Sequence, residues 1–256
     1  MDLKLNGNSQ YNIQVRDENN PTVFKYYHEY DVRLLKSAWK QTIFNSKFFK
    51  TPNVLSINDD KNDISSFEMQ YIKGNSFVEF FSTATKNDLD LLIEKIDGYF
   101  SERIKEEKIF PIDIFFRKLH QIDAVDYEFI FNNLNGIRMF VGECHGDMTF
   151  SNMIFQHDIY LIDFLDSFIE SPTMDLIKLR QDTHLYYSLN MVKDKGIDLT
   201  KIKMCFNYID EWLVSKYPIE NYRTLQTLNL LRIHPYIKQD DLRDFVQTKI
   251  NELWQH

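Results

Sequence analysis

Residues 144–152 read CHGDMTFSN and residues 161–164 read LIDF, and these two stretches constrain the fold most strongly. Asp147 and Asn152 lie five positions apart in the first stretch, and Asp163 stands in the second. A single Asp or Asn in a turn is usually solvated or acts as a cap. Three of them in this order, separated by a predicted hairpin, indicate one joint site instead.

The interval from Asp147 to Asn152 equals that between the base Asp and the metal-binding Asn in the catalytic loop of protein kinases. HGD, this Asn and the following IDF together resemble the aminoglycoside phosphotransferase and choline kinase family, whose small-molecule kinases share the protein-kinase-like fold. SPTMDL at 171–176 resembles the Pro-x-x-Asp-Leu segment of that family. The match is close over residues 144–176 and loose elsewhere.

The resemblance implies a phosphotransferase that uses ATP and Mg²⁺, with an α+β, two-lobe fold. It makes Asp147 the catalytic base or hydroxyl-orienting acid, and Asn152 and Asp163 the Mg²⁺ ligands. His145 is expected to brace the loop by hydrogen bonding, and Asp175 to be structural.

The first part of the chain reads as β-rich, and Gly74 ends it. Alternating apolar residues and polar turns predict strands over 3–5, 11–15, 22–27, 54–57 and 66–72, and helical spacing predicts one helix over 30–44. We therefore expect a nucleotide-binding lobe over 1–74 and a catalytic and substrate-binding lobe over 75–256.

The second part reads as mainly helical, with one strand pair. Apolar residues at three- and four-residue spacing predict helices over 89–104, 112–122, 127–134, 174–188, 202–216, 222–233 and 240–254. Asn87 is a plausible N-cap of the first. The strand pair is expected over 153–155 and 160–163.

Lys25 is the expected cation for the nucleotide phosphates. VFK at 23–25 resembles the kinase strand in which apolar residues precede an inward lysine, and strand alternation puts Val23 and Lys25 on one face. Glu29 is the expected helix acid that pairs with this lysine, and Asp31 is the other candidate. Both could instead be acids favoured by the helix dipole at the first turn.

Two further segments are expected to contact ATP. Gly7 and Ser9 lie where a phosphate-covering loop is expected, although an ordinary hairpin turn explains Gly7 equally well. Met69 and Tyr71 lie in a segment that resembles the family's hinge, where backbone groups meet the adenine. An amphipathic strand ending at a Gly turn is compatible with that role.

The acceptor is expected to be a small molecule with a hydroxyl group. Only twelve positions separate Asp163 from Asp175, without the Ala-Pro-Glu ending of the protein-kinase activation segment, which disfavours a protein substrate. Asp166 remains open between a metal or substrate role and a surface role. Arg232 could meet an anionic or sugar-like substrate or complement a helix C-terminus. Choline, ethanolamine, an aminoglycoside, a sugar or a polyol all remain candidates.

Aromatic side chains accompany the C-terminal helices and could form a cage for a quaternary ammonium, although aromatic residues at helical spacing more often form a core. They are His184, Tyr186, Tyr187, Trp212, Tyr217 and Trp254.

Composition excludes several classes of protein. The 256 residues are 43% hydrophobic, which is typical of a folded chain, and the net charge of −8 without a long basic run disfavours a nucleic-acid partner. This charge either favours a cationic acceptor or merely aids solubility. Two cysteines without metal-ligand spacing, no apolar N-terminal signal and no membrane-spanning stretch predict a reduced cytoplasmic protein. The oligomeric state stays open, and the alternative function is a nucleotide-binding pseudokinase or scaffold.

Overall fold

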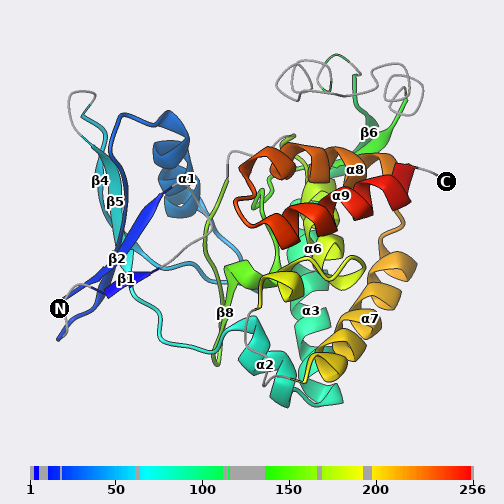
Figure 1. The fold of residues 1–256 in the computed structure, drawn as a ribbon, viewed down its shortest axis with the longest axis horizontal. Helices are drawn as coiled ribbons and strands as arrows, with labels where there is room; N and C mark the ends of the chain where they lie inside the picture. The colour runs from blue at the N-terminus through cyan, green and yellow to red at the C-terminus, as the bar shows by residue number, and fades with distance from the viewer. Residues whose placement is uncertain are drawn as a thin grey trace. The chain divides into compact units, whose positions relative to one another are not determined.

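The computed structural model describes residues 3–5, 11–17, 19–60, 64–111, 113, 115, 136–165, 169–192 and 198–254. The chain divides into two compact units, Met1–Phe77 with Asn152–Asp166, and Val78–Ser151 with Ser167–His256. The first unit therefore includes a later segment that a single break at Gly74 would assign to the second. The predicted α+β class is confirmed, with a small antiparallel sheet in the first unit and mainly helices in the second (Figure 1).

The first unit is built on a five-stranded antiparallel sheet in the order β1-β2-β3-β5-β4, with one helix (Figure 1). Its elements are β1 (Leu3–Leu5), β2 (Asn12–Arg16), β3 (Thr22–Tyr27), α1 (Val32–Ile43), β4 (Val54–Asn58) and β5 (Ser65–Gln70). Val23 and Lys25 of β3 are both buried, whereas their neighbours along the strand are partly exposed. Val23 packs with Leu34 and Ala38 of α1, so this face of β3 is the one that α1 covers.

A short hairpin completes the first unit. It consists of β8 (Met153–Phe155) and β9 (Ile159–Leu161), paired in the register Met153↔Leu161. Asn75 exchanges backbone hydrogen bonds of 2.9 Å with Phe155 in both directions. Gly74 precedes this contact, and a Cβ built on it would lie 2.6 Å from Ile154 Cγ2 and 2.9 Å from the Phe155 carbonyl oxygen. The close approach of two backbones explains why glycine stands here.

The second unit is a helical assembly around α6. Among the described residues its helices are α2 (Phe77–Thr83), α3 (Lys86–Arg103), α6 (Pro172–Thr183), α7 (Leu199–Lys216), α8 (Tyr222–Ile233) and α9 (Asp240–Trp254). All twelve residues of α6 are buried. Its Met174 and Ile177 pack with Leu225 and Leu228 of α8. Helix α8 also packs against α9, which lies beside it in Figure 1.

The helix ends follow local capping rules. Thr85, not Asn87, is the N-cap of α3, and it forms a capping box with Asp88. Ser171 caps α6 and is followed by Pro172 in the first turn, where a proline loses no helical hydrogen bond. The described residues also include the 3₁₀ turns η1 (Phe150–Asn152), η2 (Ser188–Met191) and η3 (His234–Tyr236).

Some elements differ from the sequence prediction. The strand pair β6 (Glu106–Ile109) and β7 (Arg138–Val141) and the helix α2 were not predicted. The helices predicted over 112–122 and 127–134 lie almost entirely outside the described residues. Within the described part of the chain, none of the helices combines the length and apolar character that a membrane span requires.

Candidate active site

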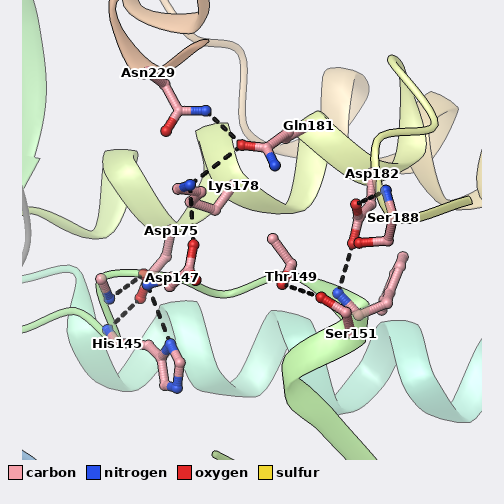
Figure 2. A network of polar contacts seen from close by, with 12 residues as sticks. His145, Asp147, Thr149, Ser151, Asp175, Lys178, Gln181, Asp182, Ser188 and Asn229 are labelled. Carbon is pink, nitrogen blue, oxygen red and sulfur yellow. Dashed lines mark hydrogen bonds and ion pairs between the residues drawn. The ribbon is translucent and has the colours of Figure 1, made fainter. Parts of the chain in front are cut away.

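The loop that carries Asp147 is held by Asp175 of α6 (Figure 2). Asp175 Oδ2 accepts hydrogen bonds from Tyr99 Oη at 2.7 Å and from the His145 backbone N–H at 2.6 Å, and Oδ1 accepts from the Gly146 N–H at 2.8 Å. Gly146 has φ +92°, a conformation that glycine adopts without strain. His145 is buried, and its Nδ1 accepts from the Asp147 N–H at 3.2 Å. His145 and Asp175 thus make the bracing contacts expected of them.

A second acid of α6 holds the far end of the same loop. Asp182 accepts from the backbone N–H of Phe150 at 2.7 Å and from that of Ser188 at 3.0 Å (Figure 2). Burial raises the pKa of Asp182 to about 6, and these hydrogen bonds oppose the rise. The two acids together fix the backbone on both sides of Asp147.

Asp147 itself pairs with a buried lysine that the sequence analysis did not identify. Lys178 Nζ lies 2.9 Å from Asp147 Oδ1, and the two side chains are 3% and 25% exposed, respectively. Burial raises the pKa of Asp147, but Lys178 and then Arg232 and His145 outweigh it, so the pKa is lowered. Burial in turn lowers the pKa of Lys178, against the attraction of Asp147. Asp147 is therefore ionised at neutral pH.

Lys178 is oriented by a chain of amides that reaches α8. Its Nζ donates to Gln181 Oε1 at 3.2 Å, and Asn229 Nδ2 donates to the same oxygen at 2.7 Å (Figure 2). Asp175, Lys178 and Asp182 are spaced three and four residues apart, so they share one face of α6. Charged residues at this spacing on one face of the helix were the signal available in the sequence.

Asn152 and Asp163, the predicted metal ligands, lie at the same end of the β8–β9 hairpin in the first unit. Beyond the pair Met153↔Leu161, the Ile162 N–H donates to the Asn152 carbonyl at 3.0 Å and extends the ladder by one step. Asp163 follows directly, with φ +60°, a conformation that is uncommon for residues other than glycine and often marks functional sites. The pairing of β8 with β9 thus brings Asn152 and Asp163 close together, although the hairpin separates them in the sequence.

Lys25 pairs with Asp163 rather than with a helix acid. Its Nζ lies 2.9 Å from Asp163 Oδ1, and the lysine side chain is 3% exposed. Glu29 is exposed, and its backbone carbonyl accepts from the Ser65 N–H. Asp31 is the N-cap of α1 and binds Arg33, which is the alternative left open by the sequence. The predicted pairing of Lys25 with Glu29 is therefore replaced, in the described structure, by a pair with the predicted metal ligand.

Helix α1 contributes differently from expectation, since it holds the backbone that follows Asp163. Ser37 Oγ donates to the Phe164 carbonyl, and Lys40 Nζ donates to the Leu165 carbonyl at 3.1 Å. The rings of Phe44 and Phe164 meet at 5.0 Å. These contacts position the segment that carries Asp163.

The structure describes only some of the other residues that were predicted to contact the nucleotide. Gly7, Ser9 and Asp166 lie outside the described residues. Met69 is buried in the core of the first unit, where its sulfur is 3.4 Å from Gln41 Nε2. Tyr71 follows β5 and is 38% exposed. Met69 could therefore serve a nucleotide through its backbone only.

Several of the aromatic residues considered for a cage have separate partners in the described structure. Tyr217 packs with Phe100 and Trp212, whereas His184 Nδ1 meets the Tyr222 hydroxyl at 2.9 Å. Burial and the carboxylates of Asp147 and Asp182 raise the pKa of Tyr187. These contacts support the core interpretation of Tyr217.

The donor chemistry of the first unit suits Mg²⁺ bound with nucleotide phosphates. The Asn152 amide and the Asp163 carboxylate offer hard oxygen ligands, and Mg²⁺ commonly takes one or two protein oxygens beside phosphates and water. Within the described ranges, no cluster of three or more His, Cys, Asp or Glu side chains offers an all-protein metal cage. Lys25 would then supply the cation for the phosphates.

The fold and these residues define a known structural class: the chain has the kinase-like fold of the aminoglycoside phosphotransferases. It is similar to the apo crystal structure of a thermostable mutant of aminoglycoside phosphotransferase APH(4)-Ia, with TM-score 0.60 and 10% identity over 99% of this chain and 93% of that chain.

Two further solved structures show the same likeness of fold. The streptomycin–ATP–APH(2")-IIa ternary complex matches with TM-score 0.57 and 16% identity, over 100% of this chain and 91% of that chain. ADP-bound APH(2'')-Ib matches with TM-score 0.57 and 17% identity, over 100% and 92%. No protein-family model and no curated protein sequence matches this chain.

Proposed function

We propose that this protein is an ATP- and Mg²⁺-dependent cytoplasmic kinase that transfers the γ-phosphoryl group to a hydroxyl of a small molecule. The ion pair between Lys25 and Asp163 carries the proposal, because it joins the expected phosphate cation to the expected metal ligand across 138 positions of sequence. Solved structures of the same fold, with ATP and streptomycin or with ADP, support it.

Different residues of the chain would bind the nucleotide and the metal ion. Lys25 would bind the nucleotide phosphates, and Asn152 and Asp163 would hold Mg²⁺. The ion, when bound, neutralises charge that develops on the phosphates. Met69 and Tyr71 remain our candidates for backbone contacts with the adenine, and Gly7 and Ser9 for the phosphate loop.

Asp147 would meet the acceptor hydroxyl. Because its pKa is lowered, the carboxylate is ionised and can accept the hydroxyl hydrogen bond, aiming the oxygen at the phosphorus. It can take the proton once the new P–O bond makes that proton acidic. Orientation is thus its main contribution, and strong basicity is not needed.

Asp147→Asn tests this proposal. Asn is isosteric and retains an oxygen for Lys178, so we expect a folded protein whose turnover falls by about 10²–10⁴-fold, while Mg-ATP still stabilises it thermally. The assay is ADP release across a panel of choline, ethanolamine, aminoglycosides, sugars, polyols and hydroxy acids. Normal phosphorylation of the acceptor by the variant would contradict the assigned role.

Two other outcomes separate the alternatives. Stabilisation of the wild-type protein by Mg-ATP without phosphorylation of any compound would favour a nucleotide-binding pseudokinase or scaffold. Failure to bind ATP at all would overturn the kinase proposal.

A further inference from the structure

Helices α6 and α8 run antiparallel, and this places Arg232 near Lys178. The end of α6 meets the start of α8, since His184 contacts Tyr222 at 2.9 Å. Three residues back along α6, Gln181 accepts from Asn229, which lies seven residues further along α8. Three residues further back along α6 lies Lys178, and three residues further along α8 lies Arg232. Each step of three residues covers about 4.5 Å of helix, so both cations reach the same level.

Electrostatic coupling agrees with this geometry. Burial is the largest influence that lowers the pKa of Arg232, and Asp147 is the first group to oppose it. Arg232 also contributes to lowering the pKa of Lys178. Arg232 is thus close enough to act on both members of the Asp147–Lys178 pair.

Arg232 is partly buried and lacks, among the described residues, a partner for one buried nitrogen of its guanidinium. Its Nε is buried without a hydrogen-bond partner among the described residues. Among the described residues, no carboxylate forms an ion pair with Arg232, whereas Asp147 forms one with Lys178. On the same helix, Asn229 Oδ1 is also buried without a partner in the described structure. An unpartnered buried donor is costly, so Arg232 Nε indicates a site for a ligand that accepts hydrogen bonds. Asn229 Oδ1 is itself an acceptor and would not contact an anion.

One of the positive charges near Asp147 is in no ion pair among the described residues. Lys178 and Arg232 bring two positive charges, and Asp147 brings one negative charge. Asp182, four residues further along α6, accepts from the N–H groups of Phe150 and Ser188 and also attracts Lys178. Asp147 and Asp182 both attract Lys178, so Arg232 remains as a further positive charge beside this group, where it would attract an anion and repel an ammonium group.

We propose that the acceptor carries an anionic group, a carboxylate or a phosphate, close to the hydroxyl that is phosphorylated, and that Arg232 binds this group beside Lys178. The inference rests on the proposed kinase function. The anion shares Lys178 with Asp147, which frees a carboxylate oxygen for the hydroxyl. In the transfer, the bond from ADP to the γ-phosphorus breaks, the acceptor O–P bond forms, and the hydroxyl proton passes to Asp147.

This acceptor differs from the cationic one that the net charge of −8 suggested. The net charge sums the whole chain, whereas the acceptor meets the few charges around Asp147. An aminoglycoside or choline would bring its cation next to Lys178 and Arg232, so both are expected to be poor acceptors.

Matched pairs of acceptors test the charge requirement. The wild-type protein is assayed with glycerate against glycerol, a sugar monophosphate against its free sugar, and kanamycin and choline as cations, with ADP release and product mass as readouts. We expect at least one anionic acceptor to exceed its neutral partner by about tenfold or more in kcat/KM. Comparison of glycerate with the sugar monophosphate distinguishes a carboxylate from a phosphate. Equal or better use of neutral or cationic acceptors overturns the proposal and leaves the kinase function standing.

Substitution of Arg232 tests the residue. For Arg232→Gln we expect the KM of the anionic acceptor to rise about tenfold or more, with the KM of Mg-ATP unchanged and the preference over the neutral partner lost. Arg232→Lys should restore part of that preference. Arg223→Gln is the matched control, because Arg223 is exposed on the same helix. An unchanged acceptor KM in Arg232→Gln would refute the assignment.

A wild-type measurement covers the case in which the Arg232 variants do not fold. Inorganic phosphate should inhibit competitively against the acceptor and not against Mg-ATP. Competition with Mg-ATP alone would refute an anion site next to Asp147. Loss of Mg-ATP binding by the wild-type protein would instead remove the underlying kinase proposal.

Discussion

Asp175→Ala should be among the most damaging single substitutions in the second unit. The side chain is fully buried and accepts three hydrogen bonds, from Tyr99, His145 and Gly146. Its loss leaves three buried donors without a partner, at about 1–3 kcal/mol each, or about 3–9 kcal/mol in total.

The true value should lie near the lower end of this range. Burial raises the pKa of Asp175, and the attraction of His145 and the hydrogen bonds only partly oppose it, so the carboxylate itself is costly to bury. Removing that charge therefore recovers part of the free energy of unfolding that is lost with the hydrogen bonds. We therefore expect a decrease in the free energy of unfolding of about 3–4 kcal/mol, which corresponds to about 6–16 °C in melting temperature for a chain of this size.

Thermal and urea unfolding of Asp175→Ala and Tyr99→Phe measure this. Tyr99→Phe removes one donor and leaves no orphaned N–H, so it should cost only about 1 kcal/mol. Turnover should also fall in Asp175→Ala, because the backbone of His145 and Gly146 loses its anchor beside Asp147. If Asp175→Ala is no less stable than Tyr99→Phe, the anchoring argument fails.

Three other predictions address separate parts of the molecule. Because burial raises the pKa of Asp182 from 3.8 to about 6, the native state binds more protons between these values, and stability is lost as pH rises through this window. Asp182→Asn should remove that dependence, so the stability difference between variant and wild type should change by about 3 kcal/mol between pH 4 and 7; a parallel pH profile would contradict it. Lys25→Met should weaken Mg-ATP binding by about tenfold or more in calorimetry while the apolar side chain keeps the buried position filled; an unchanged Kd would argue against phosphate binding by Lys25. Gly74→Ala should lower the free energy of unfolding by about 1–3 kcal/mol, because its Cβ would meet the Phe155 carbonyl at 2.9 Å, and a neutral effect would show that β8 can move away.

The predicted elements that were confirmed have strong local patterns. The strand Thr22–Tyr27 and the helices Tyr222–Ile233 and Asp240–Trp254 have the predicted bounds. Strand β6 was missed because its residues, EEKI, are all exposed and show no apolar alternation.

The buried charged residues of α6 were the main feature that the sequence patterns did not predict. A helix buried on every side is usually apolar all round, and charged residues in a helix normally indicate a solvated face. In α6 the charged residues are buried because the loop around Asp147 supplies their partners, and that loop lies some thirty residues earlier in the chain. Lys178 and Asp182 therefore escaped notice.

The sequence alone identified Asp147, Asn152 and Asp163 as candidates for one site, because the five-residue step from Asp147 to Asn152 and the hairpin before Asp163 are local features of the chain. It also placed Lys25 on the inner face of its strand. Only the tertiary structure decided the partners: Asp163 for Lys25, and Lys178 for Asp147. The reason is physical, since a buried charge must pair with whatever opposite charge the packing brings near, and sequence separation does not limit that choice.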